Sequence, residues 1–146
     1  MKIPAVKKNS ETIHTSDFGL LEKSLSNRPL SLIVDDEDDI CFLLKQILQS
    51  RNIESYCVNN LADAELFLQT YDPAVIFLDN KLPDGFGVDR IHSFKDKHPS
   101  TPIIMITAHD NYREKAISEG ADYFISKPFS KNTILEAVQQ LGIITF

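Results

Sequence analysis

Short apolar runs alternate with longer amphipathic segments from residue 30 onward, and this alternation restricts the fold more than any other feature of the sequence. Each run is followed by apolar residues at the three- and four-residue intervals of one helix face. We expect strands at Leu32–Val34, Ser55–Val58, Ala74–Leu78, Pro102–Ile106 and Tyr123–Ile125. We expect helices over residues 40–48, 64–71, 111–119 and 134–141, and one more that ends near Lys97.

Short connections between these elements limit how the strands can be joined. A helix between consecutive strands favours parallel strands linked by right-handed crossovers. Strands that are apolar throughout are typical of a sheet covered by helices on both faces. The sequence therefore predicts an α/β fold, a doubly wound five-stranded parallel sheet flanked by five helices. In such a sheet, ligands bind at the carboxyl ends of the strands.

The length of 146 residues fits one domain of this kind, which we assign to residues 30–146. Residues 1–29 lack a sustained period and are rich in Lys, Ser, Thr and Asn, so we predict a flexible N-terminal arm. A short helix that begins at Ser16 and includes Leu25 is the alternative for part of this arm.

Charge and composition argue against several classes of protein. Residues 30–146 contain ten Lys and Arg against eighteen Asp and Glu, which disfavours direct binding of nucleic acid. No apolar run approaches the roughly 18 residues of a membrane span, and the N-terminus lacks the apolar core of a signal peptide. Cys41 and Cys57 form no Cys-x-x-Cys motif, so we expect two small buried thiols, no disulfide or zinc site, and a reduced cytoplasmic compartment.

Polar residues follow the predicted strands at the edge where parallel strands end. Asp35 and Asp36 follow the first strand, Asp79 the third, Thr107 the fourth and Lys127 the fifth. Clustered carboxylates raise one another's pKa unless a cation lies among them, and a few oxygen ligands with room for water suit Mg²⁺. An ammonium and a hydroxyl can neutralise phosphoryl oxygens. The pattern predicts phosphoryl transfer onto Asp79, which gives an acyl phosphate.

Five motifs, in order and with matching spacing, resemble those of a known family. They are Val34-Asp35-Asp36-Glu37, Phe77-Leu78-Asp79, Leu82-Pro83-Asp84-Gly85, Met105-Ile106-Thr107-Ala108 and the segment from Gly120 to Phe129. Over about residues 30–141 the sequence resembles the receiver domain of two-component response regulators, which has a flavodoxin-like fold. Each motif alone is weak, and the five together are specific.

The resemblance implies a set of metal ligands around the phosphoacceptor. Asp79 would accept the phosphoryl group and contribute to Mg²⁺ binding. Asp36 would bind the metal directly, and Asp35 would act through the metal's water shell. The backbone carbonyl of Lys81 would complete the protein ligands.

The resemblance also implies the residues that hold and sense the phosphoryl group. Lys127 would pair with one phosphoryl oxygen, and Thr107 would hydrogen-bond another. Phe124 matches the family's switch aromatic and would move into the space that Thr107 leaves. A cis peptide bond before Pro128 would direct Lys127 into the site.

The implied function is a signalling switch, not a turnover enzyme, although the receiver catalyses its own phosphorylation and dephosphorylation. A sensor histidine kinase or a histidine phosphotransfer protein would donate the phosphoryl group. Phosphorylation would then alter a protein-interaction face in a phosphorelay. The output would be a downstream protein partner or an effector domain beyond residue 146. A phosphorylation-dependent homodimer is left open.

Lys81 and His109 form a separate hypothesis about how long the phosphoryl group persists. Lys81 lies two residues after the acceptor, and His109 lies two residues after Thr107. Both positions flank the path by which water would reach the acyl phosphate, so these side chains would lengthen its lifetime. The alternative is that both are solvated side chains without this role.

Other functions fit the sequence less well. A phosphatase of the haloacid-dehalogenase type needs an acidic residue where Lys81 stands. A dinucleotide-binding oxidoreductase is disfavoured because the segment Gly85–Arg90 lacks the third Gly of the fingerprint and follows the wrong strand. A degenerate receiver that only docks other proteins is a third alternative. The residues Glu37, Asp38 and Asp39 have a structural explanation as the acidic start of a helix.

Overall fold

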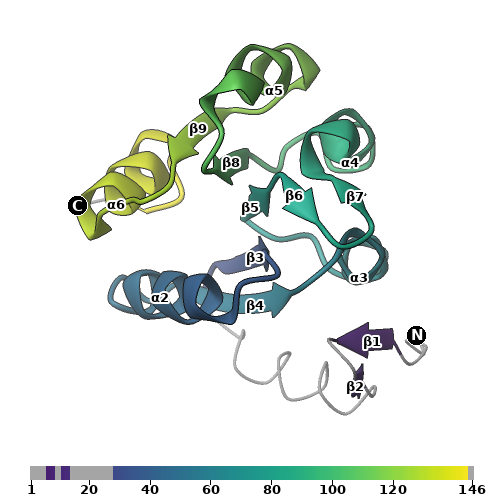
Figure 1. Cartoon of the computed structure of the whole chain (residues 1–146). Helices are drawn as coiled ribbons and strands as arrows, with labels where there is room; N and C mark the ends of the chain where they lie inside the picture. The colour runs from purple at the N-terminus through teal and green to yellow at the C-terminus, as the bar shows by residue number, and fades with distance from the viewer. Residues whose placement is uncertain (1–5, 9–10, 14–27, 145–146) are drawn as a thin grey trace.

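A five-stranded parallel sheet forms the centre of the molecule in the computed structural model, which describes residues 6–8, 11–13 and 28–144 (Figure 1). The strand order is β4-β3-β5-β8-β9. The strands are β3 (Leu30–Val34), β4 (Glu54–Val58), β5 (Val75–Asp79), β8 (Ile103–Thr107) and β9 (Tyr123–Ser126). This topology confirms the predicted doubly wound sheet, and its strand order reverses between β3 and β5.

Helices cover both faces of the sheet (Figure 1). In the described part of the chain these are α2 (Asp38–Gln49), α3 (Leu61–Leu68), α4 (Ile91–Lys97), α5 (Arg113–Glu119) and α6 (Lys131–Gln140). Helices α2 and α6 pack on one face, and α3, α4 and α5 pack on the other. Alternate side chains of each strand therefore enter different cores: Leu32 and Val34 face α3, while Ile33 faces α2.

The helix boundaries differ from the sequence prediction in ways that local geometry explains. Short 3₁₀ turns, η1 (Gly87–Arg90) and η2 (Asp110–Tyr112), come immediately before α4 and α5. Helix α3 ends at Leu68, before Tyr71, whose ring stacks on Phe67 from outside the helix with 4.9 Å between ring centroids. Helix α5 ends where predicted, at Gly120, whose φ of 114° suits a residue without a side chain.

Two small antiparallel ribbons were not predicted. Strands β6 (Lys81–Leu82) and β7 (Gly85–Phe86) pair where we expected only a loop. Strands β1 (Val6–Lys8) and β2 (Glu11–Ile13) pair within the segment predicted as an N-terminal arm. The short helix considered from Ser16 lies outside the described residues. None of the described helices is long and apolar enough to span a membrane.

The cysteines contradict the sequence prediction, because Cys41 and Cys57 form a disulfide and are not separate thiols. Cys41 lies in the first half of α2, which packs along β4, the strand that contains Cys57. The two Cα atoms are 6.2 Å apart, within the range that a disulfide spans. No local sequence pattern marks this pair, because its proximity depends on how α2 packs after the crossover. The argument for a reduced compartment from unpaired cysteines therefore fails.

Candidate functional site

The carboxyl edge of the sheet brings together the polar residues that follow its strands. Asp35 follows β3, Asp79 ends β5, Thr107 ends β8 and Lys127 follows β9. Strands β3 and β5 are neighbours, while the connections after them run to opposite sides of the sheet, and this arrangement opens a crevice at the edge. The fold thus places these side chains where an α/β sheet binds its ligands.

Three carboxylates form a compact cluster at this edge. Asp35, Asp36 and Asp79 each offer an oxygen atom, and these atoms all lie within 4.8 Å of one another. Asp35 is 2% exposed and Asp79 is 7% exposed, while Asp36 is open to solvent. Hard oxygen ligands with one open side fit Mg²⁺, which keeps several of its waters. The donor set therefore fits the predicted metal.

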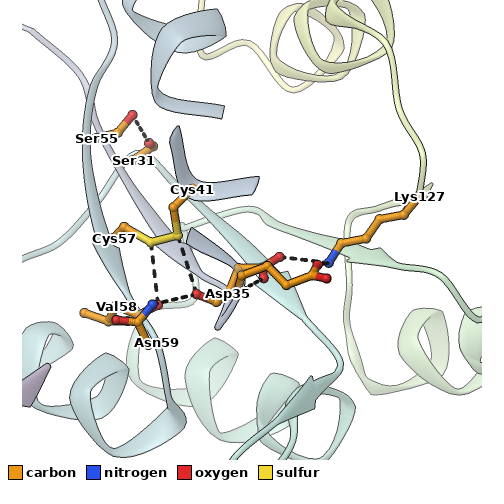
Figure 2. Close-up of a disulfide and its surroundings, with 9 residues drawn as sticks. Ser31, Asp35, Cys41, Ser55, Cys57, Val58, Asn59 and Lys127 are labelled. Atoms are coloured by element: carbon orange, nitrogen blue, oxygen red, sulfur yellow. Dashed lines mark hydrogen bonds and ion pairs between the residues drawn. A yellow bond between two sulfur atoms is a disulfide. The ribbon is translucent and has the colours of Figure 1, made fainter. Parts of the chain in front are cut away.

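Lys127 reaches into the cluster from the loop after β9 (Figure 2). Its Nζ lies 2.9 Å from Glu37 Oε2, 3.0 Å from Asp35 Oδ2 and 3.5 Å from Asp79 Oδ2. The peptide bond between Lys127 and Pro128 is cis, and the backbone N–H of Lys127 donates to the Thr107 carbonyl at 2.9 Å. One ammonium thus faces three carboxylates.

The electrostatic cost of this arrangement appears in the pKa values of the carboxyl groups. Burial raises the pKa of Asp79 to about 6, the charge of Asp35 adds to the shift, and the Lys127 ammonium opposes it. Burial also raises the pKa of Asp35. Burial alone would lower the pKa of Lys127, but Glu37, Asp35 and Asp79 raise it. Without a metal ion, the negative charge of the carboxylates at this edge therefore exceeds the positive charge of Lys127.

Backbone contacts fix the position of Asp79. The Asn80 N–H donates to Asp79 Oδ1 at 2.8 Å, and the Asn80 carbonyl accepts from the Gly87 N–H at 2.7 Å. A Cβ at Gly87 would lie 2.1 Å from the Asp79 carbonyl oxygen. Residue 87 must therefore be glycine for the chain after β7 to approach the end of β5 this closely.

Asp84 connects the loop after Asp79 to the start of α3. Its two carboxylate oxygens accept from the N–H groups of Leu61 and Ala62, each at 2.9 Å. These donors are otherwise unpaired in the first turn of a helix, where a negative charge is favourable. The sequence motif that contains Asp84 and Gly85 is thus a structural clamp on the loop beside the acidic cluster.

Thr107 and Phe124 lie on neighbouring strands beside the cluster. Thr107 is buried, and its hydroxyl accepts from the His109 N–H at 3.3 Å. Phe124 on β9 pairs with Met105 on β8, two residues before Thr107. The Phe124 ring is buried, with the Arg113 guanidinium 4.7 Å from its centroid. Thr107 thus lies at the carboxyl edge itself, and Phe124 lies two residues before the residue of β9 that pairs with Thr107.

Lys81 and His109 lie at the surface, unlike the buried residues of the site. Both side chains are exposed, Lys81 on β6 and His109 just before η2. Because both side chains are exposed, their hypothetical role concerns solvent access to the site. Sequence reasoning missed Glu37, which we assigned only to the start of a helix. The structure makes it the N-cap residue of α2 and a partner of Lys127.

Comparison with known proteins shows which family the chain resembles. The family model described as the response regulator receiver domain matches residues 31–139. Response regulator protein PilR of Pseudomonas aeruginosa is 33% identical over 114 residues, which cover 77% of this chain and 26% of PilR. Transcriptional regulatory protein SrrA of Staphylococcus aureus is 37% identical over 112 residues, which cover 75% of this chain and 46% of SrrA. The chain thus spans less than half the length of these relatives.

The fold is also similar to those of solved structures. A response regulator receiver domain protein (CheY-like) from Methanospirillum hungatei JF-1 superposes with a TM-score of 0.75 at 25% identity. The match covers 80% of this chain and 95% of the other. The similarity therefore extends over most of this chain and nearly all of the other.

Proposed function

This chain belongs to the receiver-domain family of two-component response regulators, and from that premise we propose that it accepts a phosphoryl group on Asp79 in a Mg²⁺-dependent reaction. The observation that carries the proposal is the grouping of three carboxylates within 4.8 Å beside the Lys127 ammonium. A sensor histidine kinase or a histidine phosphotransfer protein would be the donor. The domain would act as a signalling switch that catalyses its own phosphorylation and dephosphorylation, not as a turnover enzyme.

The acidic cluster provides the proposed metal site. Asp36 and Asp79 would bind Mg²⁺ directly, Asp35 would act through the metal's water shell, and the Lys81 carbonyl would complete the protein ligands. Bound there, Mg²⁺ supplies positive charge that neutralises the carboxylates and the phosphoryl oxygens. Because burial and mutual repulsion raise the pKa of Asp35 and Asp79, a cation at this edge should lower both values.

The proposed transfer needs a deprotonated Asp79. With a pKa of about 6, the carboxyl is mostly ionised at pH 7 and can attack phosphorus without losing a proton. An O–P bond forms at Asp79, the N–P bond of the donor phosphohistidine breaks, and its electron pair returns to the imidazole nitrogen. The Lys127 Nζ, which lies 3.5 Å from Asp79 Oδ2, would donate to an oxygen of the transferred group.

Thr107 and Phe124 would convert the new charge into a change of surface. The Thr107 hydroxyl would turn toward a phosphoryl oxygen, and the Phe124 ring would move into the space it leaves. Arg113 would have to follow, because its guanidinium lies on that ring. The face formed by α5, β9 and α6 would then repack, which shifts the population that a partner recognises.

Lys81 and His109 would set the lifetime of the acyl phosphate. Both side chains are exposed, Lys81 on β6 just after Asp79 and His109 two residues after Thr107, where water would approach the site. By obstructing or misorienting that water, they would slow loss of the phosphoryl group. Replacing both with Ala should shorten the half-life of the phosphorylated protein, and an unchanged half-life would remove this role.

The partners of the domain would be proteins. The donor is a kinase or phosphotransfer protein, and the output is a downstream protein or an effector domain of a longer chain. The net charge of −6 supports protein partners over nucleic acid for this domain itself. Ile117 on α5 is 49% exposed and offers apolar surface for a phosphorylation-dependent homodimer. We place this signalling in the cytoplasm.

Mass measurement after incubation with acetyl phosphate and Mg²⁺ tests the proposal. The wild-type protein should gain the mass of one phosphoryl group, and omission of Mg²⁺ should prevent the gain. The variant Asp79→Asn should gain none, while Asp96→Asn, an identical change at an exposed position of α4, should behave like wild type. A wild-type protein that never gains this mass would instead support a degenerate receiver that only docks partners.

A further inference from the structure

The disulfide between Cys41 and Cys57 lies beside Asp35, in the loop that contributes Asp35 and Asp36 to the acidic cluster (Figure 2). It links α2 to β4, the edge strand, which is hydrogen-bonded only to β3 within the sheet. The two cysteines are 16 positions apart in the sequence. The bond therefore fastens the helix that begins just after Asp36 to the strand at the edge of the fold.

Both sulfur atoms face carbonyl oxygens at the ends of strands. Cys41 Sγ lies 3.5 Å from the Asp35 carbonyl oxygen, and Cys57 Sγ lies 3.7 Å from the Val58 carbonyl oxygen. The Asn59 side-chain N–H also donates to the Asp35 carbonyl at 3.1 Å, and the Asp35 N–H donates to the Val58 carbonyl at 3.0 Å. The two sulfur atoms thus contact both residues of the backbone hydrogen bond between Asp35 and Val58, which joins the loop after β3 to β4.

The oxidation state of the two cysteines determines whether their sulfur atoms can donate hydrogen bonds to these carbonyl oxygens. In the disulfide, neither sulfur carries hydrogen, so each faces its carbonyl oxygen without donating. In the dithiol, each S–H can donate weakly to the same oxygen, and the covalent link between α2 and β4 is absent. Reduction therefore exchanges one covalent restraint for two weak hydrogen bonds beside Asp35.

Small thiols can reach the pair. A surface hollow of about 210 Å³ opens beside it, lined by Asp38, Cys41, Phe42, Lys45, Cys57 and Asn59. Cys41 is 7% exposed and Cys57 is 5% exposed. The chain contains two cysteines in total, so once one of them reacts, the other is its only intramolecular partner. The hollow gives an external thiol access to a bond that would otherwise be enclosed.

We propose that Cys41 and Cys57 are a redox modification site, a reversible dithiol–disulfide couple that controls the mobility of the loop and helix start carrying Asp35 and Asp36. The co-reactant is a low-molecular-weight thiol of the glutathione class. Two such thiols reduce the protein disulfide, the S–S bond breaks, both cysteines gain a hydrogen, and the two thiols leave joined as their own disulfide. The reverse exchange restores the bond.

Alkylation of the full chain measures the couple itself. The protein is equilibrated in buffers of graded ratio of reduced to oxidised glutathione, quenched with N-ethylmaleimide and weighed by mass spectrometry. Protein from oxidising buffers should carry no label, and protein from reducing buffers should carry two, with the same curve from both directions. Two labels at every ratio, a stable glutathione adduct, or a bond that resists reduction in the folded protein would each overturn the proposal.

Amide hydrogen exchange measures the structural effect. Peptides covering residues 35–41 and 54–58 should exchange roughly tenfold faster in the reduced protein, while a peptide from α4 should be unchanged. The melting temperature should fall by about 10 °C on reduction. Equal exchange in both states would overturn the proposed control of the loop.

Serine variants test whether loss of the covalent bond explains the faster exchange and whether the response to glutathione requires these two cysteines. The double variant Cys41→Ser/Cys57→Ser has no thiol and keeps a hydroxyl donor beside each of the same carbonyl oxygens, so it should exchange like reduced wild type and should not respond to glutathione. A variant that still responded would contradict the assignment to this pair. None of these readouts requires phosphorylation, so their outcome is independent of the proposed function.

Discussion

The two ends of the sheet surround their carboxylates in different ways. At the carboxyl edge, Asp35 and Asp79 share one ammonium, and the pKa of Asp79 is raised to about 6. At the amino edge, Asp122 accepts from the Ile103 N–H at 2.8 Å and from Lys95 Nζ at 3.0 Å. The first edge holds an excess of negative charge, while the second pairs its carboxylate with donors. This difference is the one expected if the carboxyl edge binds a cation, as we propose, and the amino edge contributes to stability.

Further hydrogen bonds pair polar groups at the amino edge. The Thr101 hydroxyl donates to the Pro73 carbonyl at 3.1 Å, and both ring nitrogens of His98 lie within 3.0 Å of an acceptor, one on Asp72 and one on Leu68. Such networks join the start of β8 to the segment before β5. Changes here should reduce stability alone, whereas changes at the carboxyl edge should affect stability and metal binding together.

Gly87→Ala should have the largest effect on stability. A Cβ there would lie 2.1 Å from the Asp79 carbonyl oxygen, so the chain must move, at a cost of about 2–4 kcal/mol. Urea unfolding measures this cost. Gly142→Ala is the control, because Gly142 has a φ of 76° but open space around it, and should cost about 1 kcal/mol. Equal costs for the two variants would refute the close approach at residue 87.

Asp79→Asn should stabilise the metal-free protein at neutral pH, which is the opposite of the usual effect of a mutation. The folded-state pKa of about 6 lies above the ordinary 3.8, so above pH 6 the folded protein bears the cost of a buried charge that the variant lacks. We expect a gain of about 1–3 kcal/mol at pH 7.

The pH dependence gives this prediction its sign. As the pH falls from about 6 to about 4, folded wild type takes up a proton before the unfolded chain does and gains stability. The advantage of Asp79→Asn should therefore fade over that window and vanish below it. Thermal unfolding across this pH range measures it, and a gain that persisted at low pH would point to a cause other than charge.

Thr101→Val should give the smallest of these effects, a loss of about 1–2 kcal/mol, because it leaves the Pro73 carbonyl without its buried donor. The loss should be the same at pH 5 and pH 7, and Mg²⁺ binding, measured by calorimetry, should be unchanged. A weaker affinity for Mg²⁺ in this variant would contradict the separation between the two edges.

The repeating pattern of strands and helices was predictable because it depends on local periodicity. The meeting of Asp35, Asp79 and Lys127 was also predictable, since parallel strands place their carboxyl ends at one edge. The pairing of Cys41 with Cys57 and of Glu37 with Lys127 was not, because each depends on how distant elements pack. Gly87 was missed for the same reason, as its constraint comes from the Asp79 backbone and not from its own segment.

The central claim is that the carboxyl edge carries negative charge which a divalent cation relieves, and thermal unfolding with added Mg²⁺ tests it most directly. At Mg²⁺ concentrations near 100 times the dissociation constant, the wild-type protein should gain about 2.7 kcal/mol at pH 7. Asp36→Asn and Asp79→Asn should lose most of that gain, and Asp96→Asn should keep it. An unchanged melting temperature for wild type in Mg²⁺, or an equal rise in all four proteins, would contradict the account.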